Sequence, residues 1–264
     1  MKWELPLGGF LSSNVEESIP AIKKANAELF DFSKDVNHLF MKVANEAVNT
    51  VQTGSMAQES ITVRLLLRGA GSFQGHLLLA ERGMHVESRV MIRSVLEVSF
   101  AVAAMIKNSE GFIRMLHDDH HKSRRQQYQS VLKYSSLDGE RLKSVQLGIA
   151  QVEKSLKLIS PKALAEMGDL EASYLTYQML SDNASHVSAA SLDHYIEAFE
   201  ARQFWQYKVG AGGPDEVRKT LVCGLHAAIP VLVGAVEALK MQQHSSEMSS
   251  VVDRLIALPY ALEL

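Results

Sequence analysis

The chain has 264 residues, of which 47% are hydrophobic and 22% charged, values typical of a globular protein that is long enough to bury a large core. Its formal net charge of −3 gives no general attraction to nucleic acid or to an anionic membrane surface, so either partner would need a local basic patch. The single cysteine, Cys223, excludes an intrachain disulfide and a cysteine-rich metal site.

The sequence predicts a cytoplasmic protein that does not enter a membrane. Apolar runs such as AAIPVLVGAV are about half as long as the roughly 20 residues that a membrane-spanning helix needs. The N-terminal stretch MKWELPLGGF has no extended apolar segment, so it lacks the pattern of a signal peptide.

Helix patterns dominate the chain, and only six prolines interrupt them. After an N-terminal tail over 1–14, one long amphipathic helix with capping residues and early glutamates is expected to end near Gly54. The helices expected after it span about 56–82, 84–107, 110–135, 139–159, 160–168 and 171–187.

The segment DHYIEAFEARQFWQYKVGAGG breaks this pattern with aromatic and β-branched residues before a glycine-rich stop. It predicts a loop or a small β-hairpin near 195–210, within an irregular insertion over 188–213. A helix then restarts at Pro214 with acidic residues in its first turn, and a last helix covers about 246–258. The predicted fold is all-α, a bundle of about seven or eight mostly long helices that form a single domain over 1–264.

Charged residues stand out in the most apolar helix pattern, RVMIRSVLEVSFAVAAMI. Arg93 and Glu97 are four residues apart and therefore lie on one side of a helix, and Arg89 extends their stripe by one turn. A buried charge without a partner is strongly destabilising, so these residues should pair with one another or with a polar group on a facing helix. A structural ion pair and the lining of a cleft both satisfy this requirement.

The stretch YLTYQMLSDNASHVS has more hydroxyl and amide groups than a helix that only fills space requires. Two adjacent stripes at spacing four carry its polar side chains, with Gln178, Asp182 and His186 on one and Tyr177, Ser181 and Ser185 on the other. This face suits hydrogen bonding to a ligand and equally suits contact with solvent. His186 is either a site residue or a cation that stabilises the helix C-terminus.

The motif RSVLE on an apolar helix, followed later by YQMLSDNASHVS, resembles the bacterial family catalogued as domain of unknown function 5677. Its members are similar in being helical, with an arginine and a glutamate one turn apart and a later tyrosine, serine and histidine. The residues that the resemblance implies are Arg93, Glu97, Tyr177, Ser181, His186 and Ser188. The family has no established activity, but its helical layout is similar to nucleotide-binding domains of prokaryotic defence and toxin systems. Many of those are RNases in which an arginine is followed shortly by a histidine.

That arginine-histidine pattern is present at Arg114 and His120 in RMLHDDHH, although about one chance match is expected from the numbers of arginines and histidines. On a helix over 110–135, His120 shares the face of the apolar residues, whereas Arg125 does not. His120 is therefore expected to point towards the interior that holds Arg93.

The segment HDDHHKSRR carries two further hypotheses. His117 and His121 are four residues apart, as in two-histidine metal sites, but nothing in the sequence selects a third ligand, so no metal and no cofactor are predicted. HHKSRR is the most basic hexamer, and on an exposed helix face it either contacts phosphate or is simply solvated. The chain has no phosphate-binding loop and no nucleophile elbow.

The preferred functional hypothesis is a binding or regulatory module with a buried polar pocket. Its ligand-binding residues would be Arg89, Tyr177, Ser181 and Asp182, and its ligand would be RNA or a small anion. Broad apolar helix faces also make a homodimer a candidate assembly.

The alternative hypothesis is a metal-independent RNase-like or related hydrolase of a prokaryotic defence or toxin system. In that case Arg93 would stabilise phosphate charge, Glu97 would orient the arginine, and His186 or His120 would transfer protons. Residue types alone do not decide between the two hypotheses, so the sequence leaves open whether the protein is an enzyme.

Overall fold

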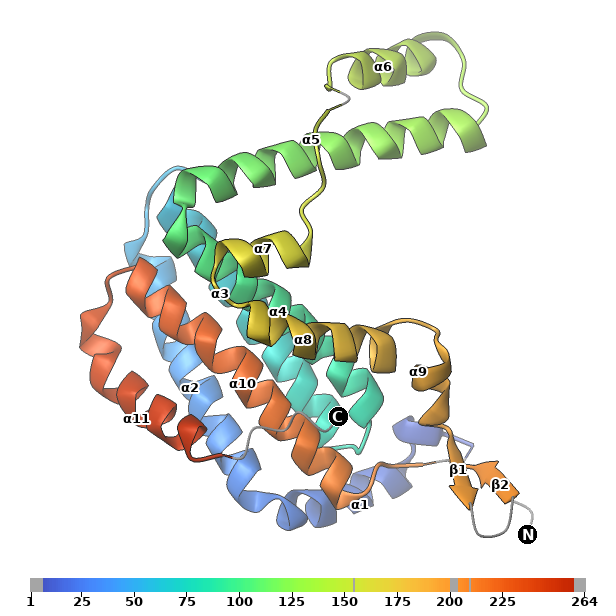
Figure 1. Cartoon of the computed structure of the whole chain (residues 1–264), viewed down its shortest axis with the longest axis vertical. Coiled ribbons are helices and arrows are strands. Elements are labelled where there is room, and N and C mark those ends of the chain that lie inside the picture. Colours follow the sequence, from blue (N-terminus) through green and yellow to red (C-terminus); the bar gives the residue numbers. More distant parts are fainter. Residues whose placement is uncertain (1–6, 154, 200–203, 209, 259–264) are drawn as a thin grey trace.

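The computed structural model describes residues 7–153, 155–199, 204–208 and 210–258, and this part of the chain is mostly helical with one small hairpin (Figure 1). Its eleven α-helices exceed the seven or eight expected. In chain order they are α1 (Ser13–Ala25), α2 (Ala27–Thr50), α3 (Gln58–Ala80), α4 (His85–Lys107), α5 (Ser109–Tyr134), α6 (Gly139–Ala150), α7 (Pro161–Met167), α8 (Glu171–Leu180), α9 (Ala189–Asp193), α10 (Pro214–Ala238) and α11 (Ser245–Ile256). The shorter helical turns are η1 (Gly9–Leu11), η2 (Ser181–Ser185) and η4 (Gln242–His244).

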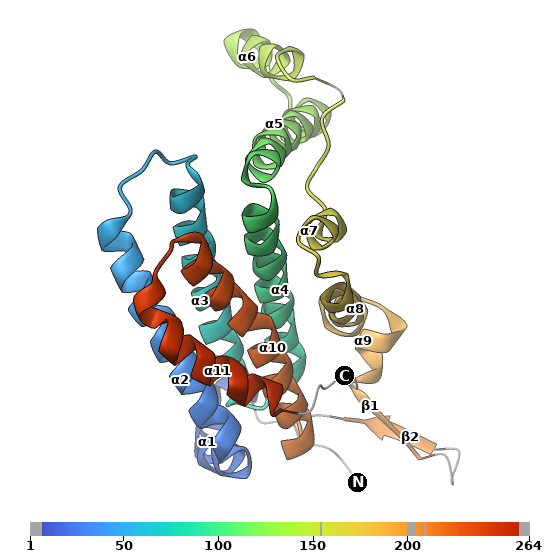
Figure 2. The same ribbon diagram turned by 60° about the vertical axis from the view of Figure 1, so that its left-hand side comes forward.

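The long helices α2, α3, α4 and α10 lie side by side and enclose the main hydrophobic core (Figures 1 and 2). On the side of α4 away from α2, the helices α7 and α8 and the turn η2 pack against α4 (Figure 2). Most apolar side chains of α4 and α10 are buried, among them Ile92, Phe100, Leu225 and Ile229, and for α4 the apolar pattern of residues 89–106 predicts this. The helix α4 is therefore covered on several sides.

Judged by its length and composition alone, the helix α10 could cross a membrane. The short apolar runs in the sequence did not indicate this. In this structure 72% of its most apolar window is buried. It packs against α2, α3 and α4, so its place in the core accounts for its composition.

The long helix expected to end near Gly54 is in fact two helices, because the chain bends at Asn26. The backbone of Asn26 has φ −129° and ψ 34°, outside the helical region. Its side-chain Nδ2 donates a hydrogen bond to the carbonyl oxygen of Pro214 at 3.1 Å. This bond joins the end of α1 to the start of α10, a contact between distant segments that periodicity does not reveal.

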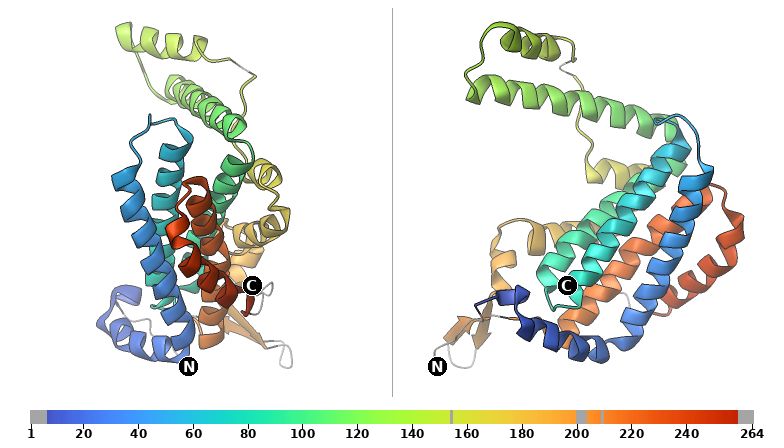
Figure 3. Two further views of the ribbon diagram at one scale, coloured as in Figure 1. Left: turned by 90° about the vertical axis from the view of Figure 1, so that its left-hand side faces the viewer. Right: turned by 180° about the vertical axis from the view of Figure 1, so that it is seen from behind.

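The helices α5 and α6 form an arm that extends away from the core (Figure 1 and the right-hand view of Figure 3). The expected helix over 139–159 ends at Ala150 and folds back beside α5. The inner face predicted for α5 is correct only in its first turns, where Phe112 is buried and Ile113 and Leu116 pack against the core, whereas Val131 further along is exposed. Arg125, expected to face solvent, donates from Nη1 to the carbonyl oxygen of Val152 at 2.8 Å. Contacts within the arm therefore decide which side of α5 is covered.

The predicted hairpin is confirmed. Strand β1 (Ile196–Phe199) pairs antiparallel with β2 (Phe204–Tyr207), with Ile196 opposite Tyr207. The short helix α9 precedes it and begins at a capping box formed by Ser188 and Ser191.

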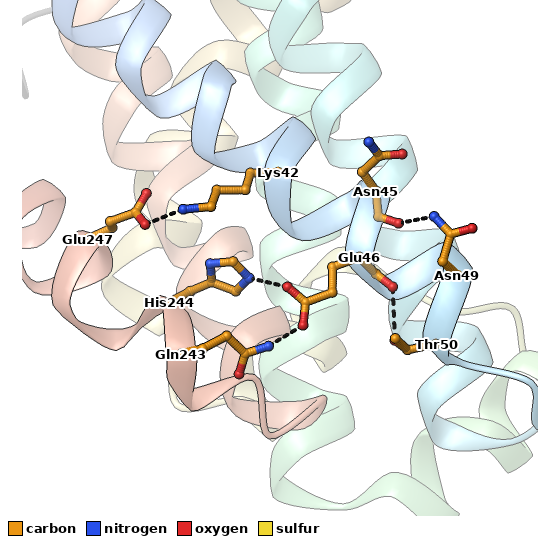
Figure 4. Close-up of polar contacts among 8 residues, drawn as sticks. All are labelled: Lys42, Asn45, Glu46, Asn49, Thr50, Gln243, His244 and Glu247. Atoms are coloured by element: carbon orange, nitrogen blue, oxygen red, sulfur yellow. Dashed lines mark hydrogen bonds and ion pairs between the residues drawn. The ribbon is translucent and has the colours of Figure 1, made fainter.

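A polar cluster fastens the C-terminal helix to α2 (Figure 4). The buried His244 places its Nε2 atom 2.8 Å from Oε2 of Glu46, and the amide of Gln243 donates to the other oxygen of the same carboxylate. Lys42 pairs with Glu247 one turn away. One carboxylate on α2 thus binds two side chains of η4 and sets the position of α11.

A buried histidine, His76, joins α3 to both α4 and α10. The hydroxyl of Ser88 donates to the carbonyl oxygen of His76 at 2.9 Å and lies 2.6 Å from its ring Nδ1, so Nδ1 is the ring nitrogen that carries the proton. A Cβ atom at residue 224 would overlap Nε2 of the ring, which explains why Gly224 stands there. Burial lowers the pKa of His76 to about 3, so the ring is neutral at neutral pH.

We predict that His76 makes the fold sensitive to acid. Its pKa is about 3 in the folded protein and near 6.5 when unfolded, so stability is lost as the pH falls from 6.5 towards 3. In that window this residue should reduce the free energy of unfolding by up to about 1.4 kcal/mol per pH unit. Urea unfolding at neutral and mildly acidic pH should therefore show that the free energy of unfolding falls less steeply with decreasing pH in His76→Leu than in the wild type. The exposed control His38→Leu should keep the wild-type slope, and equal slopes in all three proteins would refute the prediction.

Candidate functional site

Four of the residues implied by the sequence motif meet in one hydrogen-bonded group, here named the Arg93 network: Arg93, Glu97, Tyr177 and Ser181. Arg93 Nε donates to the hydroxyl of Ser181 at 2.8 Å, and Arg93 Nη1 lies 3.1 Å from Oε1 of Glu97. The hydroxyl of Tyr177 accepts from Arg93 Nη2 and donates to Oε1 of Glu97 at 3.0 Å. The network ties α8 and η2 to the middle of α4.

Aromatic packing surrounds this network. The Tyr177 ring stacks on Tyr174 at 5.5 Å, meets Phe100 nearly edge-on, and lies 4.5 Å below the guanidinium of Arg93. Burial, and then the negative charge of Glu97, raises the pKa of Tyr177 to about 12, so its hydroxyl keeps its proton and stays a donor. The side chains of Arg93 and Glu97 are 23% and 30% exposed, so the network is half-buried, with one solvent-facing edge. All three nitrogens of the Arg93 guanidinium bond or pair with residues of the network, so Arg93 acts as a structural crosslink.

A π-helical turn separates Ser181 from the residues that follow it. The N–H of His186 donates to the carbonyl oxygen of Ser181 at 3.0 Å, a bond across five residues that widens the turn. This ends the regular spacing of the expected stripe of Gln178, Asp182 and His186, which lies beside the stripe of Tyr177 and Ser181. All three side chains of that stripe are exposed, and His186 has an extended backbone with φ −107° and ψ 149°. Ser188, which the resemblance also implies, caps α9 instead.

His120 lies on the arm and not beside the Arg93 network. Together with His121, Arg124 and Tyr128 it lines a hollow of about 300 Å³ between α5 and α6. The expectation that His120 points towards the interior of Arg93 is therefore wrong, because α5 leaves the core. Within the described residues, no group of three or more histidine, cysteine or acidic side chains has a geometry that could hold a metal ion.

Arg89, one turn before Arg93, is fully buried and faces α10. Its Nη2 donates to Oε2 of Glu216 at 2.9 Å, and its Nε donates to the hydroxyl of Thr220 at 3.2 Å. Partial burial is the largest single influence on Glu216 and opposes its ionisation, but the charge and hydrogen bond of Arg89, together with His85 and Lys208, hold the pKa of Glu216 below its usual value. The remaining nitrogen, Arg89 Nη1, is buried without a hydrogen-bond partner among the described residues.

Two histidines lie against this ion pair. His85, the first residue of α4, is 7% exposed, and its Nε2 is 4.0 Å from Oε2 of Glu216. The ring of His194 meets the ring of His85 edge-on at 5.7 Å. Burial, and then the positive charge of Arg89, lowers the pKa of both histidines, so both rings are neutral at neutral pH. In the part of the chain described, the buried Nε2 atom of each ring has no hydrogen-bond partner.

Both rings line a cavity of about 240 Å³, here named the His85 cavity. Its other polar walls are Glu87, Tyr195 and Lys208. Its remaining walls are apolar side chains or glycines: Phe10, Gly83, Met84, Val86 and Gly210. Four separate segments thus meet around one space: η1, the start of α4, the residues that follow α9, and the end of the hairpin.

Sequence reasoning missed most of this cavity. It placed Arg89 in an apolar helix, where a buried arginine requires an anionic partner. The motif PDEVRKTL, which begins the other strongly apolar helix, offers Glu216 and Thr220 one turn apart, and this was the available signal. His85 and His194 belong to no recognisable pattern, because distant segments bring them together.

We predict that the Arg93 network stabilises the fold. Tyr177→Phe keeps the stacked ring but removes the hydroxyl between Arg93 and Glu97, which should lower the free energy of unfolding by about 1 kcal/mol. Arg93→Met should cost more, and the double variant should cost about 1 kcal/mol less than the sum, because both changes break one network. Urea unfolding measures these values, with Tyr207→Phe on the exposed hairpin as a control expected to have no effect. Additive costs would contradict the prediction.

Comparison with protein-family models matches residues 59–204 to a family of unknown function, DUF5677. The matched range contains the whole Arg93 network together with His85, Arg89 and His194. Comparisons with curated proteins and with solved structures give no significant match. Because the matched range spans more than half of the sequence, the chain belongs to the DUF5677 family, whose function is unknown.

Proposed function

We propose that this DUF5677 protein is a binding module that holds a small ligand in the His85 cavity. The observation that carries the proposal is the pair of buried Nε2 atoms on His85 and His194, which line the cavity without a hydrogen-bond partner among the described residues. Leaving a buried polar atom unsatisfied costs about 1–3 kcal/mol, so a ligand that bonds these atoms gains that energy on binding. A concave, mostly apolar site with a few converging polar groups is the usual form of a small-molecule site.

The walls of the cavity are positioned before any ligand arrives. The N–H of Lys208 donates to the carbonyl oxygen of Tyr195 at 2.8 Å, which joins the two ends of the hairpin. The N–H of Gly212 donates to the carbonyl oxygen of Gly83 at 2.8 Å, which joins the start of α10 to the turn before α4. These bonds favour binding, because less conformational entropy is lost when the ligand enters.

The positions of the candidate catalytic residues favour binding over hydrolysis. The RNase-like alternative needs Arg93, Glu97 and a histidine around one reacting phosphate. Arg93 is instead occupied by Glu97, Tyr177 and Ser181, His186 is exposed beyond the π-helical turn, and His120 is on the arm. We propose that the Arg93 network supports the cavity by holding η2 and the following α9 against α4.

We predict that small probes shift the NMR signals of His85 and His194 and leave that of the exposed His38 unchanged. The probes are benzoate, benzamide, benzamidinium and inorganic phosphate, each titrated to about 10 mM, enough to detect a dissociation constant near 1 mM. Met84→Trp, which fills the cavity with a larger side chain, should abolish the response.

Met56→Trp, at an exposed position between α2 and α3, is the matched control and should respond like the wild type. Circular dichroism checks that both variants are folded. If no probe moves either histidine signal, or if Met84→Trp responds like the wild type, the His85 cavity is not a binding site.

A further inference from the structure

The charged groups around the His85 cavity differ in whether they already have a bonding partner. Glu216 is already paired with Arg89, and the hydroxyl of Tyr195 donates to Glu87 at 3.5 Å. Glu87, which also lines the cavity, is therefore the acceptor of the Tyr195 hydroxyl. Within the described residues, the ammonium group of Lys208 has no ion-pair or hydrogen-bond partner. Lys208 is therefore the charged group of the cavity wall that is still available to pair with a ligand, although its charge also acts on His194 and Glu216.

The two imidazoles determine what can bond there. His85 Nδ1 lies 3.4 Å from the carbonyl oxygen of Gly83, which can only accept, so the proton of the neutral ring is on Nδ1 and Nε2 carries a lone pair. His194 bonds the backbone of Asn183, and since its Nε2 has no partner, this bond also uses Nδ1. A ligand anion can bond either Nε2 only if one proton is taken up from solvent, either onto the ring or onto the ligand.

The groups that face the two rings make such proton uptake feasible. Arg89 and Lys208 oppose it, whereas the carboxylate of Glu216, 4.0 Å from His85 Nε2, favours it. A bound anion would add a second negative charge beside the rings and shift the balance towards the protonated form. Binding should therefore become tighter as the pH falls.

The size and apolar walls of the cavity limit the ligand further. A cavity of about 150 Å³ holds benzene, so the roughly 240 Å³ here accommodates a small ring or a short chain with a carboxylate. Phe10, Met84 and Val86 provide apolar contacts for such a body. Inorganic phosphate would leave this apolar part of the wall without a partner.

We propose that the His85 cavity binds a small organic carboxylate, with its charged head against Lys208 and the Nε2 of one of the two histidines, His85 or His194, its apolar body against Phe10, Met84 and Val86, and about one proton taken up per ligand. This inference rests on the proposed binding function and adds the chemical class of the ligand.

Three probes of the same shape but different charge test this proposal: benzoate, benzamide and benzamidinium. Isothermal titration calorimetry should give a dissociation constant for benzoate about tenfold or more below those of the other two. The heat measured in buffers of different ionisation enthalpy should report uptake of about one proton, and the affinity for benzoate should rise as the pH falls from about 8 to about 6. Lys208→Met should weaken benzoate binding about tenfold. Lys143→Met, on the distant arm, should leave it unchanged (Figure 1).

The outcomes separate this inference from the proposed function. If benzamide or benzamidinium binds as tightly as benzoate and still shifts the signals of His85 and His194, the carboxylate proposal is overturned while the binding function stands. Benzoate binding without proton uptake overturns the contact between the carboxylate and the imidazoles. If none of the three probes shifts either histidine signal, both proposals fail.

Discussion

A positive charge buried between two core helices organises this protein. The guanidinium of Arg89 is fully enclosed between α4 and α10, where an unpaired charge would be strongly destabilising. It therefore requires Glu216 and Thr220 at fixed positions in the first two turns of α10. That requirement holds the starts of α4 and α10 together, and the bond from Asn26 to Pro214 and the bond from Gly212 to Gly83 lie at the same end of these helices. The His85 cavity is formed where these segments meet.

Two arginines one turn apart on α4 have different roles because different helices cover them. Arg93 faces α8 and η2, keeps partial contact with solvent, and satisfies all three nitrogens with Glu97, Tyr177 and Ser181. Arg89 faces α10, has no contact with solvent, and leaves Nη1 without a partner in the described residues. The first arrangement is that of a crosslink, and the second leaves polar atoms available near a cavity.

Local sequence patterns predicted much of the helical structure. The pattern of apolar residues located α3, α4 and α10, of which α4 and α10 are largely buried, and the aromatic segment before the glycines located the hairpin. The motif named Arg93, Glu97, Tyr177 and Ser181, and the structure places them in one network, since spacing four on two packed helices puts their side chains on facing surfaces.

The errors arose where a contact between distant segments overrides a local pattern. The bend at Asn26 depends on Pro214, and the covered side of α5 depends on α6. The π-helical turn displaced His186 from the expected stripe by adding one residue to a single turn. The His85 cavity draws its walls from several separate segments, none of which has a sequence signature of its own.

The most direct test of this account is a double-mutant cycle between Arg89 and Glu216, measured by urea unfolding. Glu216→Gln should lower the free energy of unfolding by about 2–4 kcal/mol, because it leaves the buried guanidinium without an anionic partner. Adding Arg89→Met to Glu216→Gln should restore much of that loss, which gives a coupling energy of about 2 kcal/mol or more. If the two substitutions destabilise the protein independently, the ion pair does not organise the packing of α4 against α10, and the account is contradicted.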